Sequence, residues 1–126
     1  MLRNALIIGF GGFFGTIARY LSSQLIFKIY PSSFPLATLA INVVGCFLIG
    51  VFFGVAEKVN FISLEWRMFL TIGFCGGFTT FSAFSLENVQ LLNRGEWGYV
   101  MLYSTASVVV AILATYFGIW VMKTVL

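Results

Sequence analysis

The chain has 126 residues, of which 60% are hydrophobic and 9% are charged, and its net charge is +3. Soluble domains carry roughly a quarter charged residues, so this composition indicates a membrane protein built as one compact unit, and its scattered basic residues indicate no nucleic-acid partner. Histidine and aspartate are absent, which excludes most metal and general-base designs, and Cys46 and Cys75 are flanked by apolar residues, so we expect buried free thiols.

Four apolar stretches are each long enough to cross a membrane as a helix, which requires about 20 residues. They cover residues 5–29, 34–56, 66–92 and 97–125, and the connections between them are short and rich in turn residues. The first stretch lacks the cleavage site of a secretory signal, so we expect it to remain as a span. The sequence therefore predicts an all-α membrane protein with four transmembrane helices in a single domain, residues 1–126.

Polar side chains within the first two spans are the first candidates for a functional site. Arg19 lies past the middle of the first span, with Ser22 and Ser23 on the same helix face. Asn42 lies well inside the second span, and Thr38 precedes it by one helical turn. Polar groups are costly in hydrocarbon and usually face a pathway or a partner. The alternatives are an arginine that extends to the membrane surface and an asparagine that only bonds a neighbouring helix.

The third span contains the stretch CGGFTTFSAFSLE, residues 75–87. Gly73, Gly76 and Gly77 disfavour a continuous helix, so we expect a break near Gly76–Thr80. Backbone that is not helical is tolerated at membrane depth only where it is buried or lines a cavity. The break would free carbonyl oxygens, which suit Na⁺, while the restarting helix would offer N–H groups, which suit an anion.

Phenyl rings and hydroxyl groups alternate beyond the expected break. Phe81 and Phe84 lie three residues apart, and Ser82 and Ser85 flank them. Ring edges are electropositive and hydroxyls donate hydrogen bonds, so a path lined by both suits a small anion. Two rings alone would be more typical of lipid-facing side chains, because the chain has 15 phenylalanines. Their combination with the glycines, threonines and serines is what indicates a function.

Small residues recur at a spacing of four in three of the spans. The pairs are Gly11 and Gly15, Gly50 and Gly54, and Ala114 and Gly118. Such spacing lets helices approach closely. It favours a homo-oligomer, the alternative being ordinary packing within one subunit.

Basic residues are divided almost evenly between the two ends of the predicted bundle. One end carries Arg3, Lys58, Arg67 and Lys123, and the other carries Arg19, Lys28 and Arg94. Cytoplasmic loops normally hold a clear excess of Lys and Arg. Two interpretations are open: a weakly determined single orientation, or insertion both ways with formation of an antiparallel dimer.

These features resemble the Fluc (CrcB-like) family of fluoride ion channels over nearly the whole chain. The resemblance is carried by Gly11-x-x-x-Gly15-x-x-x-Arg19-Tyr20, by the stretch TLAIN ending at Asn42, and above all by GGFTTFSAFSLE, residues 76–87. It implies a fluoride-selective channel, not an enzyme, that passively exports fluoride, lowers its cytoplasmic concentration and relieves its toxicity. It also implies an antiparallel, dual-topology homodimer in the lipid bilayer of a prokaryotic plasma membrane or inner membrane.

The resemblance also implies roles for individual residues. The fluoride pathway would be lined by Phe81, Phe84, Asn42, Ser82, Thr38, Glu87, Tyr103 and Ser107. Arg19 would lie at the vestibule, and backbone oxygens of Gly76 and Thr79 would hold a structural Na⁺ at the dimer centre. The chain departs from the family pattern at Ala37, Ala83 and Ala111, and the missing hydroxyl at Ala83 removes one ligand from the polar track.

Other classes of protein fit the sequence less well. A small multidrug exporter also has four short spans, but it requires a carboxylate in the first span to exchange protons for cationic drugs. The acidic residues here are Glu57, Glu65, Glu87 and Glu96, none of them in that span. A scaffold protein has no use for donors that converge on a mid-span break, and an intramembrane enzyme would need a nucleophile and a base.

Overall fold

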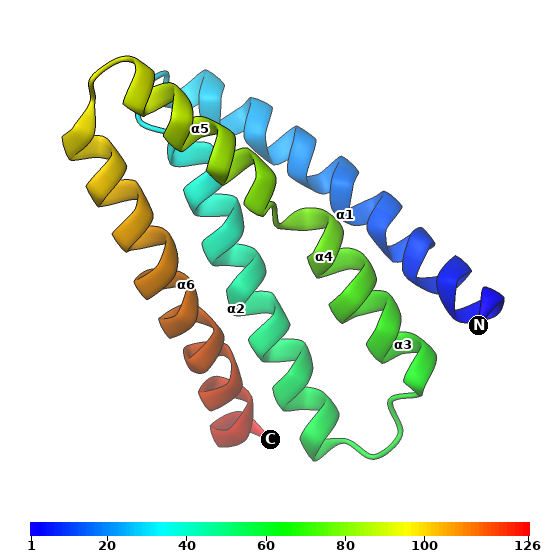
Figure 1. The fold of residues 1–126 in the computed structure, drawn as a ribbon. Coiled ribbons are helices and arrows are strands. Elements are labelled where there is room, and N and C mark those ends of the chain that lie inside the picture. The colour runs from blue at the N-terminus through cyan, green and yellow to red at the C-terminus, as the bar shows by residue number, and fades with distance from the viewer.

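The computed structural model covers residues 1–126 and consists of helices joined by short loops (Figure 1). The uninterrupted long helices are α1 (Leu2–Ile29), α2 (Leu36–Lys58) and α6 (Trp97–Val125). The remaining hydrophobic stretch is divided into α3 (Leu64–Met68), the π-helical segment η1 (Phe69–Cys75), α4 (Gly76–Phe78) and α5 (Phe81–Asn93). Four stretches are thus long and apolar enough to cross a membrane. Their ends lie within three residues of the ranges predicted from the sequence.

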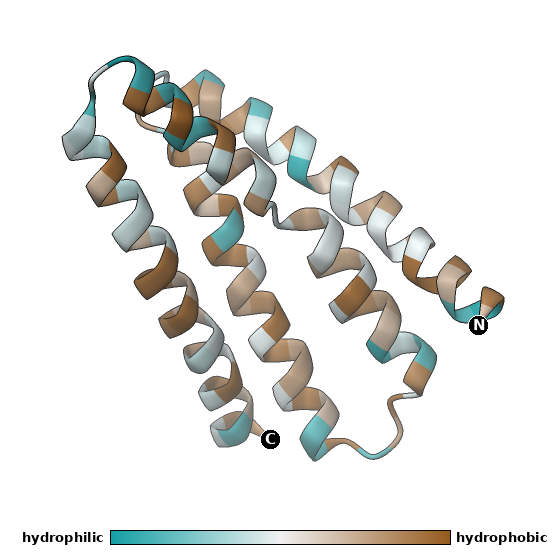
Figure 2. Cartoon of the chain, in the orientation of Figure 1, coloured by the Kyte–Doolittle hydropathy of each residue, from teal (hydrophilic) through white to brown (hydrophobic).

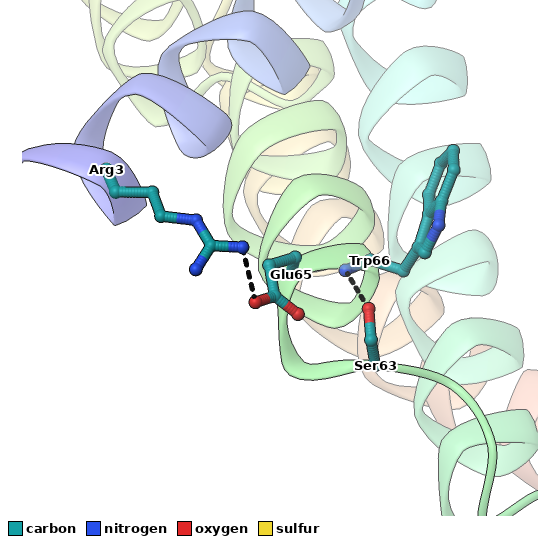
Figure 3. Close-up of polar contacts among 4 residues, drawn as sticks. All are labelled: Arg3, Ser63, Glu65 and Trp66. Atoms are coloured by element: carbon teal, nitrogen blue, oxygen red, sulfur yellow. Dashed lines mark hydrogen bonds and ion pairs between the residues drawn. The ribbon is translucent and has the colours of Figure 1, made fainter.

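Local sequence signals explain where the helices begin and end. Helix α1 ends before Pro31, and α2 begins directly after Pro35, because a proline disfavours helical backbone at the residue before it but is well accommodated where a helix starts. Ser63 caps α3, where its hydroxyl accepts a hydrogen bond from the backbone N–H of Trp66 at 3.3 Å (Figure 3). Gly95, at φ 72°, supplies the left-handed residue that reverses the chain between α5 and α6.

The surface of a single subunit is mainly apolar. Only 12 of 126 residues are buried, and the buried hydrophobic residues are Ile41, Cys75, Phe78, Leu91 and Tyr103. Figure 2 shows hydrophobic residues along the length of the helices and hydrophilic residues concentrated near the bundle ends and in part of α5. A chain of this kind is stable only when lipid or another subunit covers most of its surface.

Most charged residues other than Arg19 and Glu87 lie at the two ends of the bundle. The N-terminus, the α2–α3 loop and the C-terminus share one end (Figure 1). There, Arg3 pairs with Glu65 at 3.0 Å (Figure 3), and Lys123 pairs with Glu57 at 3.5 Å. At the opposite end, Arg94 donates to the carbonyl of Ser33 in the α1–α2 loop.

Glycines hold α1 against the third hydrophobic stretch. A Cβ atom at Gly11 would meet the carbonyl oxygen of Phe69, and a Cβ at Gly77 would meet the backbone of Gly12. Gly73 lies in η1, and Gly76 and Gly77 lie in α4, so all three are helical. The extended residues are Thr79 and Thr80, which lie within the range predicted for the break, residues 76–80. The glycines themselves stay helical, and Gly73 and Gly77 permit close helix contact.

Helices α2 and α6 run in the same direction (Figure 1). Lys58 donates to the carbonyl of Lys123, 65 residues later in the chain. A Cβ at Gly50 would meet the backbone of Thr115, and these two residues are also 65 residues apart. Residues one helical turn apart follow each other along both helices, so the same separation aligns residues 38, 42 and 46 with residues 103, 107 and 111. This register decides which side chains can share a site.

The glycine stripes of α2 and α6 are used within the subunit. Gly50 and Gly54 face α6, and Gly118 faces the backbone of α2 near Phe47 and Val51. Gly11 and Gly15 face η1 and α4 in the same way. Of the two interpretations of this spacing, the structure therefore supports packing within one subunit, and the glycines give no support to a homo-oligomer.

Candidate functional site

Two extended residues separate α4 from α5. Thr79 has φ −84° and ψ 158°, and Thr80 has φ −151° and ψ 118°. The Asn42 side chain on α2 donates through Nδ2 to the Thr80 carbonyl at 3.0 Å, and the Thr80 N–H donates to Asn42 Oδ1 at 2.8 Å. The amide thus satisfies both backbone groups of Thr80, as a neighbouring strand would. One N–H of this side chain has no partner in the subunit.

The same hydrogen bonds release two carbonyl oxygens. In a continuous helix, the Thr80 N–H would donate to the Gly76 carbonyl and the Ala83 N–H would donate to the Thr79 carbonyl. Thr80 donates to Asn42 instead, and Ala83 donates to the Thr80 hydroxyl at 3.2 Å. The carbonyls of Gly76 and Thr79 are left without their helical donors. Their oxygens are the type of ligand that a hard cation takes.

A pocket of about 250 Å³ lies beside the extended residues. It is lined by Asn42, Cys46, Thr79, Thr80, Phe81, Phe84, Ser107, Val108 and Ala111. Four of the residues predicted for the pathway, Asn42, Phe81, Phe84 and Ser107, are therefore brought together here from three different helices.

The chemistry of this pocket is that of weak donors. The rings of Phe81 and Phe84 are tilted by 43° with centroids 5.4 Å apart. The Ser107 hydroxyl oxygen is buried and has no hydrogen-bond partner. Ring edges, a hydroxyl and an amide N–H can stabilise a small anion, and no charged side chain lines the pocket to hold that anion tightly.

A second polar cluster lies one helical turn nearer the start of α2 and α6. The Thr38 hydroxyl donates to Glu87 Oε1 at 2.6 Å, and the buried Tyr103 hydroxyl donates to Glu87 Oε2 at 3.5 Å. The ring of Phe84 contacts that of Tyr103 edge to face, at 5.0 Å between centroids. This contact joins the carboxylate cluster to the pocket at Phe81.

Arg19 lies in a neighbouring cavity of about 290 Å³. Its lining includes Thr38 from the carboxylate cluster and Thr80 from the extended segment. Arg19 is half-buried and forms no ion pair in the subunit. A further cavity of about 370 Å³ contains Thr38, Glu87 and Arg94. The predicted vestibule residue is thus adjacent to the polar clusters, with Thr38 and Thr80 on the shared walls.

Ser82 and Tyr103 are the predicted pathway residues that these cavities do not include; Tyr103 is fully buried and reaches the carboxylate cluster through its hydroxyl. Ser82 lies on α5. It is exposed, and its hydroxyl lies 3.3 Å from that of Thr80. The structure also shows bridges that sequence reasoning missed: Ser104 donates to Asn88 Oδ1, and Asn88 donates to the Phe84 carbonyl. The spacing of four residues between Phe84 and Asn88 could have predicted the second of these contacts, because it places the two residues on one face of a helix.

The fold and the site define a small integral membrane protein in which polar groups from separate helices line neighbouring cavities. Over residues 6–119 the sequence matches the model of the CrcB family, described as CrcB-like protein, Camphor Resistance. The chain belongs to this CrcB-like family.

Proteins of similar sequence carry a more specific name. The chain is 43% identical over 122 residues to the fluoride-specific ion channel FluC of Flavobacterium psychrophilum, covering 97% of the chain and 98% of that protein. It is 40% identical over 118 residues to the protein of the same name from Azobacteroides pseudotrichonymphae, covering 94% of each. It is 43% identical over 119 residues to that from Phocaeicola vulgatus, covering 94% of the chain and 98% of the relative.

Proposed function

We propose that the protein is a fluoride-selective ion channel that passively exports fluoride and thereby relieves its toxicity. The observation that supports this most strongly is the pocket formed by Asn42, Phe81, Phe84 and Ser107, in a chain whose relatives are named fluoride-specific ion channels. An inside-negative potential drives an anion outward with about 2.3 kcal/mol per 100 mV, so a passive path is sufficient. The site of action is then a prokaryotic plasma or inner membrane.

In the proposed mechanism, the anion is stabilised inside the pocket by dipoles, and the charge of Arg19 acts from outside the pocket. Arg19 draws anions toward the cavities from outside the pocket, because it is half-buried and unpaired. Inside the pocket, the edges of the Phe81 and Phe84 rings and the Ser107 hydroxyl replace part of the water shell of the ion. Conduction requires binding that is favourable enough for entry and weak enough for release. Neutral donors satisfy both conditions.

The functional unit in this proposal is an antiparallel, dual-topology homodimer. Phe81 is 80% exposed in the single subunit although it lines the pocket, so one wall of the pathway is missing. A second copy supplies that wall. The division of basic residues, four at one end and three at the other, favours insertion in both orientations.

A structural Na⁺ at the centre of this dimer is the further part of the proposal. The released carbonyl oxygens of Gly76 and Thr79 fit the ion, and an inverted partner contributes the same pair. The ion would neutralise the crowded oxygens and hold the two extended segments together. Because backbone oxygens are the ligands, Thr79→Ala should retain Na⁺-dependent stability; loss of that dependence would assign the ligand to the hydroxyl.

The function is tested by ion efflux from liposomes that contain the purified protein. We expect rapid efflux of fluoride and efflux of chloride no faster than from liposomes without protein. Equal rates for the two anions would contradict selectivity, and no fluoride efflux above the protein-free control would contradict the function itself.

The orientation is tested separately by adding two or three lysines to the C-terminal tail. Lys and Arg near span ends set topology, so this variant should insert one way and lose fluoride protection in cells. An oppositely biased variant expressed with it should restore protection. Full protection by the single biased variant would exclude an antiparallel dimer.

A further inference from the structure

Cys46 occupies a particular level of the α2–α6 register. At the first two levels, Thr38 is aligned with Tyr103 and Asn42 with Ser107, and these residues belong to the two polar clusters. Cys46 is aligned with Ala111 at the next level, and both line the pocket of about 250 Å³.

The level after Cys46 is closed. A Cβ atom at Gly50 would meet the Thr115 carbonyl oxygen, so the two helix backbones are in contact there. The helices stay close at Gly54, where a Cβ would meet the Met122 side chain and the Ile119 backbone. Cys46 therefore lies at the closed end of the groove, where an ion that follows α2 and α6 has to turn away from them.

The two thiols of the chain are in different environments. Cys75 is 2% exposed and lines none of the main cavities. Cys46 is only part-buried, and it shares its pocket with Ser107, whose hydroxyl oxygen is buried without any hydrogen-bond partner. An unpaired buried hydroxyl needs a ligand or water in the pocket. Both cysteines are free, as expected, but only Cys75 is buried; the expected burial of Cys46 is wrong.

We propose that Cys46 forms the wall of the ion pathway at the end of the α2–α6 groove and is a modification site for small thiol-reactive electrophiles, which close the pathway. This inference rests on the proposed function. Cys46 and Ala111 line the same pocket as Phe81 and Ser107, so a group added to the thiol would take up part of the space beside these two residues.

Methyl methanethiosulfonate is a suitable probe because it is small and neutral. The Cys46 thiol loses its proton to water, and the thiolate attacks the sulfenyl sulfur of the reagent. A sulfur–sulfur bond forms, the bond between sulfenyl and sulfonyl sulfur breaks, and methanesulfinate leaves with the electron pair. The product carries an S-methylthio group, which dithiothreitol removes.

The experiment compares the unmodified sequence, Cys75→Ala and Cys46→Ala in fluoride-loaded liposomes, each against its own untreated rate. We expect treatment to slow efflux at least about tenfold in the unmodified sequence and in Cys75→Ala, because a narrow constriction controls conduction. Cys46→Ala should retain its own rate, and dithiothreitol should restore the other two. Mass spectrometry should locate the adduct on Cys46, and gel filtration should show the same assembly before and after treatment.

Three results would overturn the inference. The first is an adduct on Cys46 with unchanged efflux, and the second is no adduct under conditions that label the unfolded chain. The third is dissociation of the assembly, which would place Cys46 at a subunit contact. Absence of fluoride efflux before treatment is a distinct result: it contradicts the proposed function, and the inference falls with it. If Cys75→Ala does not fold, the unmodified sequence and Cys46→Ala still give the comparison.

Discussion

The α2–α6 interface has two halves, one that borders a pocket and one in which the helix backbones are in contact, although the register between the helices is the same in both. In the first half, Asn42 and Ser107 are aligned and border an open pocket. In the second half, Gly50 and Thr115 are aligned at the same separation of 65 residues, as are Lys58 and Lys123 at the end of the helices, and the backbones are in contact at Gly50. The helices, their direction and their register are the same, so the difference arises from the side chains.

Side-chain size and hydrogen bonding explain the difference. Glycines let the second half close, because no Cβ atom separates the helices. In the first half, Asn42 reaches across to Thr80, and Phe84 packs on Tyr103, so the third hydrophobic stretch forms one wall of the cavity. The contact at Gly50 in the second, closed half holds the two helices in register, and this register aligns the residues that border the pocket in the first, open half.

The largest effect is expected in the closed half, from Gly50→Ala. The new Cβ would meet the Thr115 carbonyl oxygen, which is backbone and cannot move aside. We expect a loss of about 3 kcal/mol, at the upper end for overpacking, seen as a lower melting temperature in detergent. Gly98→Ala is the matched control, since a Cβ there has open space; an equal loss in both variants would show that the contact at Gly50 is not what matters.

In the open half, Asn42→Ala should have the next largest effect. It removes both partners of the part-buried Thr80 backbone, and unsatisfied groups of this kind cost about 2 kcal/mol. Fluoride efflux should be lost as the extended segment moves. Asn88→Ala is the control, because it removes the same type of amide, whose partners, the Phe84 carbonyl and the Ser104 hydroxyl, lie in α5 and α6 and not in the extended segment. A smaller effect at Asn42 than at Asn88 would contradict the bridging role.

Replacing the rings should change conduction more than folding. Phe81→Ile or Phe84→Ile fills similar space without an electropositive ring edge, so fluoride efflux should fall about tenfold while the protein stays assembled. Phe117→Ile is the control in the second half, where Phe117 contacts Phe47 at 5.9 Å outside the pocket. Normal efflux in both pocket variants would remove the rings from the mechanism.

The smallest effects are expected from removing either of two hydroxyl groups of α6, one in each half of the interface with α2. Ser107 has a free hydroxyl in the open half, whereas the Thr115 hydroxyl donates to the Ala111 carbonyl within its own helix. Ser107→Ala should slow efflux by roughly threefold, the value of one weak donor, without loss of stability. Thr115→Val should leave efflux unchanged. If the two variants behaved alike, the Ser107 hydroxyl would have no role toward the ion.

Local features of the sequence were sufficient to predict the four helices. A membrane span requires about 20 apolar residues, and this requirement acts within each segment, independently of its neighbours. The end of α1 before Pro31 and the start of α2 after Pro35 are also local, because a proline restricts the backbone of its immediate neighbours. Asn42, Phe81 and Phe84 were predicted from their positions in the spans and from the family resemblance, and Ser107 from the resemblance alone; the four residues line one pocket.

Only the tertiary structure decided how these segments fit together. The Asn42–Thr80 bridge joins residues 38 apart, and the Thr38–Glu87 contact joins residues 49 apart. No local pattern encodes such pairs, because they depend on the register between α2 and α6 and on the path of the third stretch. The same reason explains why the sequence could not place the extended residues at Thr79 and Thr80 within the predicted range 76–80, and why Cys46 could not be distinguished from Cys75. A thiol is identical in sequence whether it faces packed backbone or a cavity, and the neighbouring helices alone determine which it meets.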